Sequence, residues 1–136
     1  MDKRLKRYLQ KLEVLRDRLD FINSNLPSEK EMINNRILRK AIYKEFQELI
    51  EVVADLCAMS VKDRGFLVKD DYSNIERMDF ILTLDLIESL KRSNGLRNVL
   101  VHDYNGINDN LAYISIKELL PAIYEFEKRF KEWISK

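Results

Sequence analysis

Residues 5–22 read LKRYLQKLEVLRDRLDFI, and the spacing of their apolar side chains decides the fold class. The apolar positions recur at alternating intervals of three and four: Leu5, Tyr8, Leu12, Leu15, Leu19 and Ile22. This spacing places them in one stripe along an α-helix. Basic residues occupy much of the opposite face. We therefore predict an amphipathic helix that ends between Asn23 and Pro27.

The next segment predicts the central helix of the fold. Ser28 followed by Glu31 has the spacing of a capping box, in which the hydroxyl and the carboxylate each satisfy a backbone N–H. From there we predict a helix that runs to about Met59. Its apolar stripe is too wide for one neighbour: Ile33, Ile37, Leu38, Ala41, Ile42, Phe46, Leu49, Val52, Val53 and Leu56. We expect this helix to pack against at least two others, or against another chain.

A connection and a short helix follow. Residues 60–72 are interpreted as the connection. Ser73 and Glu76 repeat the capping-box spacing and predict a short helix after it. Thr83 is the expected N-cap of a longer helix whose apolar residues run from Leu84 to Leu100.

The C-terminal third of the chain predicts one more helix. Asn105–Gly106 should end the helix before it, and residues 108–110 should start the next. Pro121 should kink or divide that last helix. The fold class is therefore all-α, an up-and-down bundle of four to five helices with the last kinked near Pro121, and residues 1–136 form a single domain.

Composition agrees with packed helices and excludes several classes of protein. The chain has 136 residues, three Gly and two Pro, with 35% charged and 46% hydrophobic residues. Its net charge of +1 does not favour non-specific nucleic-acid binding, so any such site must be a local patch. Residues 1–18 hold seven basic and three acidic residues. We interpret this basic face as solvated surface, with guidance of RNA phosphates as the alternative.

The single cysteine, Cys57, excludes an internal disulfide and suits a reducing compartment. It lies in an apolar stretch, where a buried and inert thiol is expected. The N-terminal charges are not followed by the apolar segment of a signal peptide, and no apolar run approaches the length of a membrane span. We therefore expect a soluble cytoplasmic protein with no membrane partner.

Residues 97–104, RNVLVHDY, carry the chemistry. They contain the only histidine in the chain, within a polar cluster near a helix end. One His and one Cys far apart give no zinc-ligand spacing, and neither a nucleophile elbow nor a phosphate-binding glycine loop is present. What remains is acid–base chemistry by His102, with Arg97 as a fixed cation for a phosphate. The structural alternative is a histidine that caps carbonyl groups or pairs with a carboxylate.

Helix geometry constrains how these residues could act together. On a regular helix Asn98 and His102 are about 40° apart in projection, whereas Arg97 and His102 are about 140° apart. Arg97 and His102 could converge if the turn loosens, if the arginine reaches round, or if they meet across a dimer axis.

The motif resembles that of the HEPN superfamily: an Arg, a polar residue, three further positions and His-x-Tyr at a helix end. RNVLVHDY is most similar to the HepT toxins of HEPN–MNT toxin–antitoxin pairs. Chain length, helix order, the Pro-interrupted last helix and the positions of Glu51 and Asp55 are also similar to that group. Leu96 departs from the pattern, because an aromatic residue often precedes the motif Arg.

The resemblance implies a metal-independent, cofactor-free endoribonuclease whose RNA cleft lies between the two protomers of a homodimer. Arg97 and His102 would be catalytic and Asn98 supporting. The partner would be a minimal nucleotidyltransferase (MNT) antitoxin, as in type VII-like pairs, which inhibits the toxin by transferring AMP to Tyr104.

Two alternatives stay open. The chain could be a non-catalytic HEPN subunit that binds substrate or serves as an adaptor for a nucleotidyltransferase, or a helical bundle used only for assembly. An intact Arg97 and His102 favour the nuclease. For Glu51 and Asp55 we expect salt bridges, with support of the cleft as the alternative.

Overall fold

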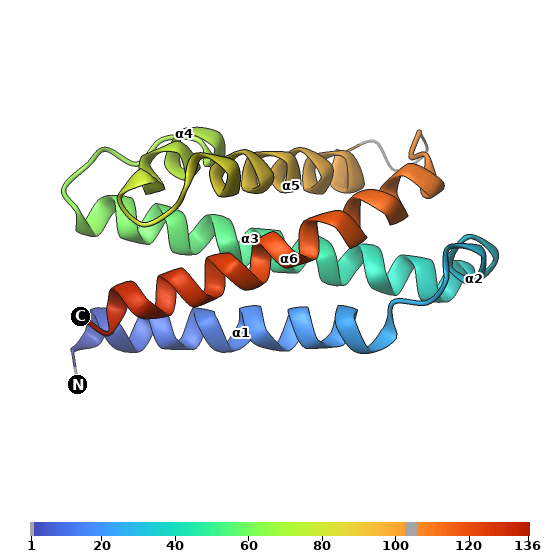
Figure 1. Ribbon diagram of the computed structural model, residues 1–136, viewed down its shortest axis with the longest axis horizontal. Coiled ribbons are helices and arrows are strands. Elements are labelled where there is room, and N and C mark those ends of the chain that lie inside the picture. The colour runs from blue at the N-terminus through green and yellow to red at the C-terminus, as the bar shows by residue number, and fades with distance from the viewer. Residues whose placement is uncertain (1, 103–105) are drawn as a thin grey trace.

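A computed structural model describes residues 2–102 and 106–136, and every regular element within those ranges is a helix (Figure 1). The four long helices are α1 (Lys3–Asn25), α3 (Arg36–Asp63), α5 (Leu84–His102) and α6 (Asp109–Ile134). The short elements are α2 (Glu29–Asn34), α4 (Asp71–Glu76) and the 3-10 helix η1 (Arg77–Phe80). The expected all-α bundle is confirmed. In the described ranges no helix has the length and apolar character that a membrane span requires.

The four long helices pack as a ring. α1 lies against α3, α3 against α5, α5 against α6, and α6 against α1. Helices α1 and α5 are therefore diagonal to each other, and Figure 1 shows them on opposite sides of the molecule. The short helix α4 packs on α3 and α5, and α2 packs on α3 and α6. Both chain termini lie at one end of the bundle, whereas α5 ends at the other (Figure 1).

Helix α3 is the core helix. Eleven of its residues are buried, and it contacts α1, α4 and α5 at once. Its wide apolar stripe, expected from the sequence, is therefore covered largely within the chain. Cys57 is fully buried in this core, as expected, and burial raises the pKa of its thiol.

The single helix predicted from Ser28 to Met59 is wrong, because the chain breaks at Asn35 into α2 and α3. Asn35 has an extended backbone, and its side-chain oxygen accepts a hydrogen bond from the backbone N–H of Leu38. This N-cap starts a new helix. The predicted start is confirmed, since the Ser28 hydroxyl accepts from the N–H of Glu31 at 3.2 Å.

Two of the three remaining helix starts agree with the sequence. Thr83 caps α5 through the N–H of Leu86, and Asn108 caps α6 through the N–H of Leu111. The cap assigned to Ser73 is wrong, because the N-cap of α4 is Asp70, three residues earlier, whose carboxylate accepts from the N–H of Ser73. Pro121 lies inside α6, which continues as one helix on both sides, so the proline does not divide it.

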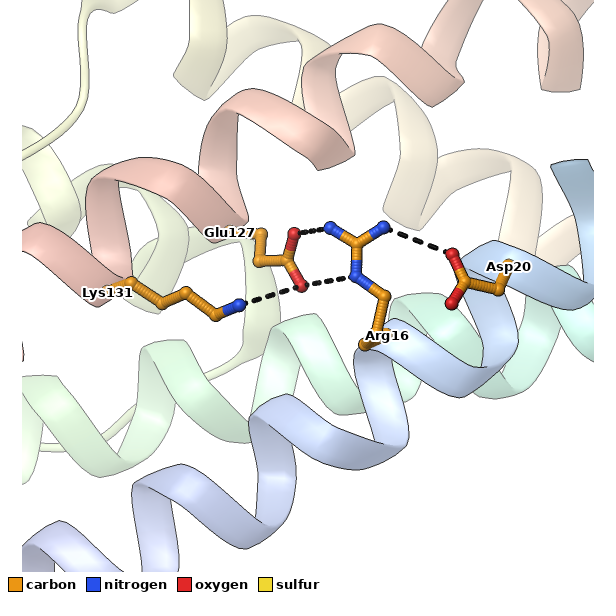
Figure 2. Close-up of polar contacts among 4 residues, drawn as sticks. All are labelled: Arg16, Asp20, Glu127 and Lys131. Atoms are coloured by element: carbon orange, nitrogen blue, oxygen red, sulfur yellow. Dashed lines mark hydrogen bonds and ion pairs between the residues drawn. The ribbon is translucent and has the colours of Figure 1, made fainter.

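A buried carboxylate joins α1 to α6. Glu127 is 4% exposed and accepts hydrogen bonds from Nε (3.0 Å) and Nη2 of Arg16, while Lys131 lies 3.6 Å away (Figure 2). Arg16 also donates to Asp20 of its own helix at 3.1 Å. Burying a carboxylate is costly unless it is paired, and these cations pair it. Part of the N-terminal positive charge therefore holds the bundle together.

Candidate functional site

Helix α5 presents the motif without interruption. It runs from Leu84 to His102, continues through Gly95, and carries Arg97, Asn98 and His102. Its last residue, His102, is exposed. Helix α5 ends on the side of the bundle away from the chain termini (Figure 1). Tyr104, the expected AMP acceptor, lies outside the described residues.

Arg97 is held between two helices. Its Nη2 donates to Oε1 of Glu51 on α3 at 3.0 Å, and its Nη1 donates to Oδ1 of Asn98 at 3.0 Å. Gln47, one turn before Glu51, donates to the same carboxylate oxygen at 3.2 Å. The Arg97 side chain is 23% exposed, so the guanidinium is fixed in position but still reachable from solvent.

This arrangement keeps Glu51 ionised. Partial burial opposes the charge on its carboxylate, but the hydrogen bonds from Arg97 and Gln47 outweigh burial and hold the pKa of Glu51 below its usual range. Arg97 therefore faces a carboxylate that stays negative at neutral pH. Charge-assisted bonds of this kind fix the orientation of a guanidinium more firmly than neutral ones.

One chain does not bring Arg97 and His102 together. Because α5 remains α-helical to His102, the two residues stay about 140° apart around its axis. Arg97 points to α3, and no hydrogen bond within residues 2–102 and 106–136 joins it to His102. Convergence by a loosened last turn is therefore wrong. Of the arrangements expected from the sequence, a meeting across two chains remains.

The two acidic residues of α3 have different partners. Glu51 contacts Arg97, whereas Asp55 pairs with Lys11 of α1 at 2.9 Å. Only Glu51 belongs to the candidate site. Gln47 was missed by the sequence analysis, although it lies four residues before Glu51, a spacing that places two side chains on one helix face. In the described part of the chain no group of three or more His, Cys, Asp or Glu side chains is placed to hold a metal ion.

A second polar cluster fixes the start of α6, close in sequence to the end of α5. The hydroxyl of Tyr43 on α3 donates to Oδ1 of Asp109 at 2.5 Å, and Arg39 Nε lies 3.6 Å from the other oxygen. Burial and this hydrogen bond raise the pKa of Tyr43, so its hydroxyl stays protonated and remains a donor. Arg39 also donates to the carbonyl of Ile33 at 2.6 Å. The cluster ties α6 to the end of the bundle that carries His102.

Comparison with known structures defines the class of fold. The tri-AMPylated HEPN toxin of Shewanella oneidensis, solved in complex with an MNT antitoxin, superposes with a TM-score of 0.85 and 17% identity over 97% of this chain and 99% of that chain. A toxin–antitoxin structure with AMP-PNP superposes with a TM-score of 0.83 and 16% identity, over 96% and 99% of the two chains. The bundle therefore has the HEPN fold.

Sequence comparison defines the family. The HepT-like ribonuclease family matches residues 5–130. One relative is an Archaeoglobus fulgidus protein with the curated name "Putative RNase". It is 36% identical over 135 residues, which is 98% of this chain and 97% of the relative. The chain belongs to the HepT-like ribonuclease family.

Proposed function

We propose that this protein is the endoribonuclease toxin of a HEPN–MNT toxin–antitoxin pair and that it cleaves RNA without a metal ion. One observation carries the proposal. A guanidinium anchored by Glu51 and still partly exposed lies five residues before an exposed histidine, on one unbroken helix of a HepT-like chain. Residues 1–136 would act as a single domain in the cytoplasm.

The active form is a homodimer with its RNA cleft between the protomers. The divergence of Arg97 and His102 within one chain supports this, because a two-fold axis repeats every group on a second α5. Two His102 side chains would face each other across the scissile phosphate, each near an Arg97. A single exposed histidine cannot readily serve both sides of an in-line displacement, and a pair of them can.

The reaction needs only the RNA and these side chains. The 2′-hydroxyl oxygen attacks the adjacent phosphorus, and His102 of one protomer takes its proton. The bond from phosphorus to the 5′ oxygen breaks, and the partner's His102 protonates the leaving oxygen. The products are a 2′,3′-cyclic phosphate and a 5′-hydroxyl. Arg97 stabilises the charge that develops on the phosphorane oxygens, and Asn98 supports Arg97 through their hydrogen bond.

The antitoxin would inhibit this site by modifying Tyr104. Its hydroxyl attacks the α-phosphorus of ATP, pyrophosphate leaves, and AMP stays attached two residues after His102. A phosphate placed there repels the RNA backbone, and the adenosine obstructs the cleft. The names of the neighbours, a tri-AMPylated HEPN toxin and a complex with AMP-PNP, support this assignment.

The test of catalysis is an RNA cleavage assay with a chelator present. The parent should cleave, Arg97→Ala and His102→Ala should lose roughly 100-fold or more of the rate, and Arg92→Ala should match the parent. Arg92 is the control because it lies on the same helix and pairs with Glu118. Parental cleavage by His102→Ala would contradict the mechanism, and a parent that binds RNA without cutting it would favour the adaptor role.

The test of inhibition is the intact mass of the chain after co-expression with its nucleotidyltransferase. We expect a mass increase by whole AMP units in the parent and none in Tyr104→Phe. Modification that persists in Tyr104→Phe would show that another residue accepts the AMP.

A further inference from the structure

The outer face of α5 contains a feature that the proposed reaction does not use. Gly95 lies seven residues before His102, two helical turns away and within about 20° in projection. Tyr72 of α4 reaches over to this position, and its Oη lies 3.5 Å from where a Cβ of Gly95 would be. Gly95 and Tyr72 thus lie on the side of α5 that carries His102.

Packing within the chain does not require a glycine at position 95. Of the residues that the structure describes, a Cβ there would meet only Tyr72 within 4 Å, through its Oη and at an ordinary contact distance. The helix backbone is regular, so conformation does not require glycine either. Gly inside a helix costs about 1 kcal/mol relative to Ala. Among the described residues, Tyr72 alone therefore borders the space that the glycine leaves.

Tyr72 is available for binding in the same place. It is 38% exposed, although it packs against α5. Within the described part of the chain its hydroxyl has no hydrogen-bond partner. A half-exposed ring with an unused hydroxyl, beside bare helix backbone, is suited to a flat ligand with polar edges.

We propose that Tyr72 and Gly95 form a nucleotide subsite for single-stranded RNA beside the scissile phosphate. This inference rests on the proposed ribonuclease function. A base of the bound strand stacks on the ring of Tyr72 over the backbone of Gly95, and the hydroxyl bonds a ribose or phosphate oxygen. Single-stranded RNA is commonly recognised by such stacking. The strand then continues along α5 to His102.

The charges around the subsite indicate that stacking, and not attraction of phosphate, provides its binding energy. Lys91, one turn before Gly95, pairs with Glu76 at 2.8 Å and with Glu88 at 3.6 Å. Arg92 pairs with Glu118 at 3.5 Å. Because these cations are already paired, loss of the ring should weaken RNA binding equally at low and high salt.

The test measures the affinity of the full-length dimer for a labelled, unstructured oligoribonucleotide of mixed sequence. All variants carry His102→Ala so that the RNA is not cut. Tyr72→Leu should bind about 5- to 150-fold more weakly, the range observed for loss of one stacking partner, with an unchanged salt dependence. Tyr72→Phe keeps the ring and should bind more tightly than Tyr72→Leu. Phe21→Leu, at an exposed aromatic on α1, is the matched control and should bind like the parent.

Gly95→Ala gives the sharpest contrast. Its methyl group fits the chain but occupies the subsite, so RNA affinity should fall while the melting temperature rises by about 2–5 °C. Light scattering on the same samples gives the oligomeric state. If Gly95→Ala or Tyr72→Leu dissociates the dimer, the surface contacts a second chain and the subsite is wrong.

Two further outcomes distinguish a failure of the proposed subsite from a failure of the proposed ribonuclease function. A parent that binds and cleaves RNA, with Tyr72→Leu and Gly95→Ala unchanged in affinity, overturns the subsite alone. A chain without any RNA affinity overturns the ribonuclease and the subsite together.

Discussion

Arg97 on α5 and Glu51 on α3 form a hydrogen-bonded ion pair of 3.0 Å that links the motif helix to the core helix. The pair decides where the guanidinium can point. Without Glu51, the one hydrogen bond that Arg97 would keep among the described residues is that to Asn98, and its long side chain would be free to turn toward solvent.

We therefore predict that Glu51→Gln lowers RNA cleavage by roughly tenfold or more, because a misplaced catalytic group loses rate steeply. The loss should appear in kcat more than in KM, since Arg97 acts on charge that develops in the transition state. Asp55→Asn is the matched control, because Asp55 is one turn further along α3 and pairs with Lys11. Equal activity of Glu51→Gln and Asp55→Asn would show that Arg97 needs no support from α3.

The same pair makes a contribution to stability that depends on pH. The pKa of Glu51 is lower in the folded chain than its usual value, so its contribution is present above the unfolded pKa of about 4.3 and is lost as pH falls through the folded value. The pair is partly exposed, so we expect only about 0.5–1 kcal/mol at pH 7. Urea unfolding of the parent and of Glu51→Gln should differ by this amount at pH 7 and converge near pH 3. A constant difference across that range would contradict the assignment.

Tyr43→Phe should destabilise the chain by about 1–2 kcal/mol, because the Tyr43 hydroxyl donates a hydrogen bond to the carboxylate of Asp109. Tyr124→Phe is the control, since the Tyr124 hydroxyl has no hydrogen bond in the described residues. Thermal unfolding of both variants gives the comparison. If the two variants unfold alike, the link between α3 and the start of α6 contributes nothing to stability.

Two asparagines with the same burial should respond in opposite ways to replacement by leucine. Asn74 and Asn94 are each 2% exposed. Asn74 bonds both the N–H and the carbonyl of Lys69, whereas Asn94 Oδ1 has no partner among the described residues. Asn74→Leu should cost roughly 1–3 kcal/mol, and Asn94→Leu should be neutral or stabilising in chemical unfolding. Strong destabilisation by Asn94→Leu would mean that its amide is bonded after all.

The helices were predictable from the local sequence pattern wherever the residues that start a helix were unambiguous. Thr83 was identified as an N-cap and residues 108–110 as a helix start because each lies directly before an apolar repeat. The break at Asn35 was missed because the helical spacing of apolar residues continues across it. Asn35 was therefore not recognised as an N-cap. Asp70 was missed as the N-cap of α4 because it was assigned to the connection, whereas Ser73 and Glu76 have the spacing of a capping box.

The candidate site was predictable only in part. Arg97, Asn98 and His102 came from the motif, and the divergence of Arg97 from His102 followed from helix geometry. The contact between Arg97 and Glu51 joins residues 46 positions apart, and its formation depends on the register between α3 and α5. The spacing of residues in the sequence does not reveal how α3 and α5 are aligned with each other. For the same reason nothing in the sequence paired Tyr72 with Gly95.

The central claim is that one active site uses His102 from both protomers. A heterodimer of one parental and one His102→Ala chain, isolated with two different affinity tags, tests it most directly. If one histidine takes the proton and the other supplies it, the heterodimer should cleave RNA at least about 100-fold more slowly than the parental dimer. Cleavage at half the parental rate would show that each protomer works alone, and would contradict the shared site.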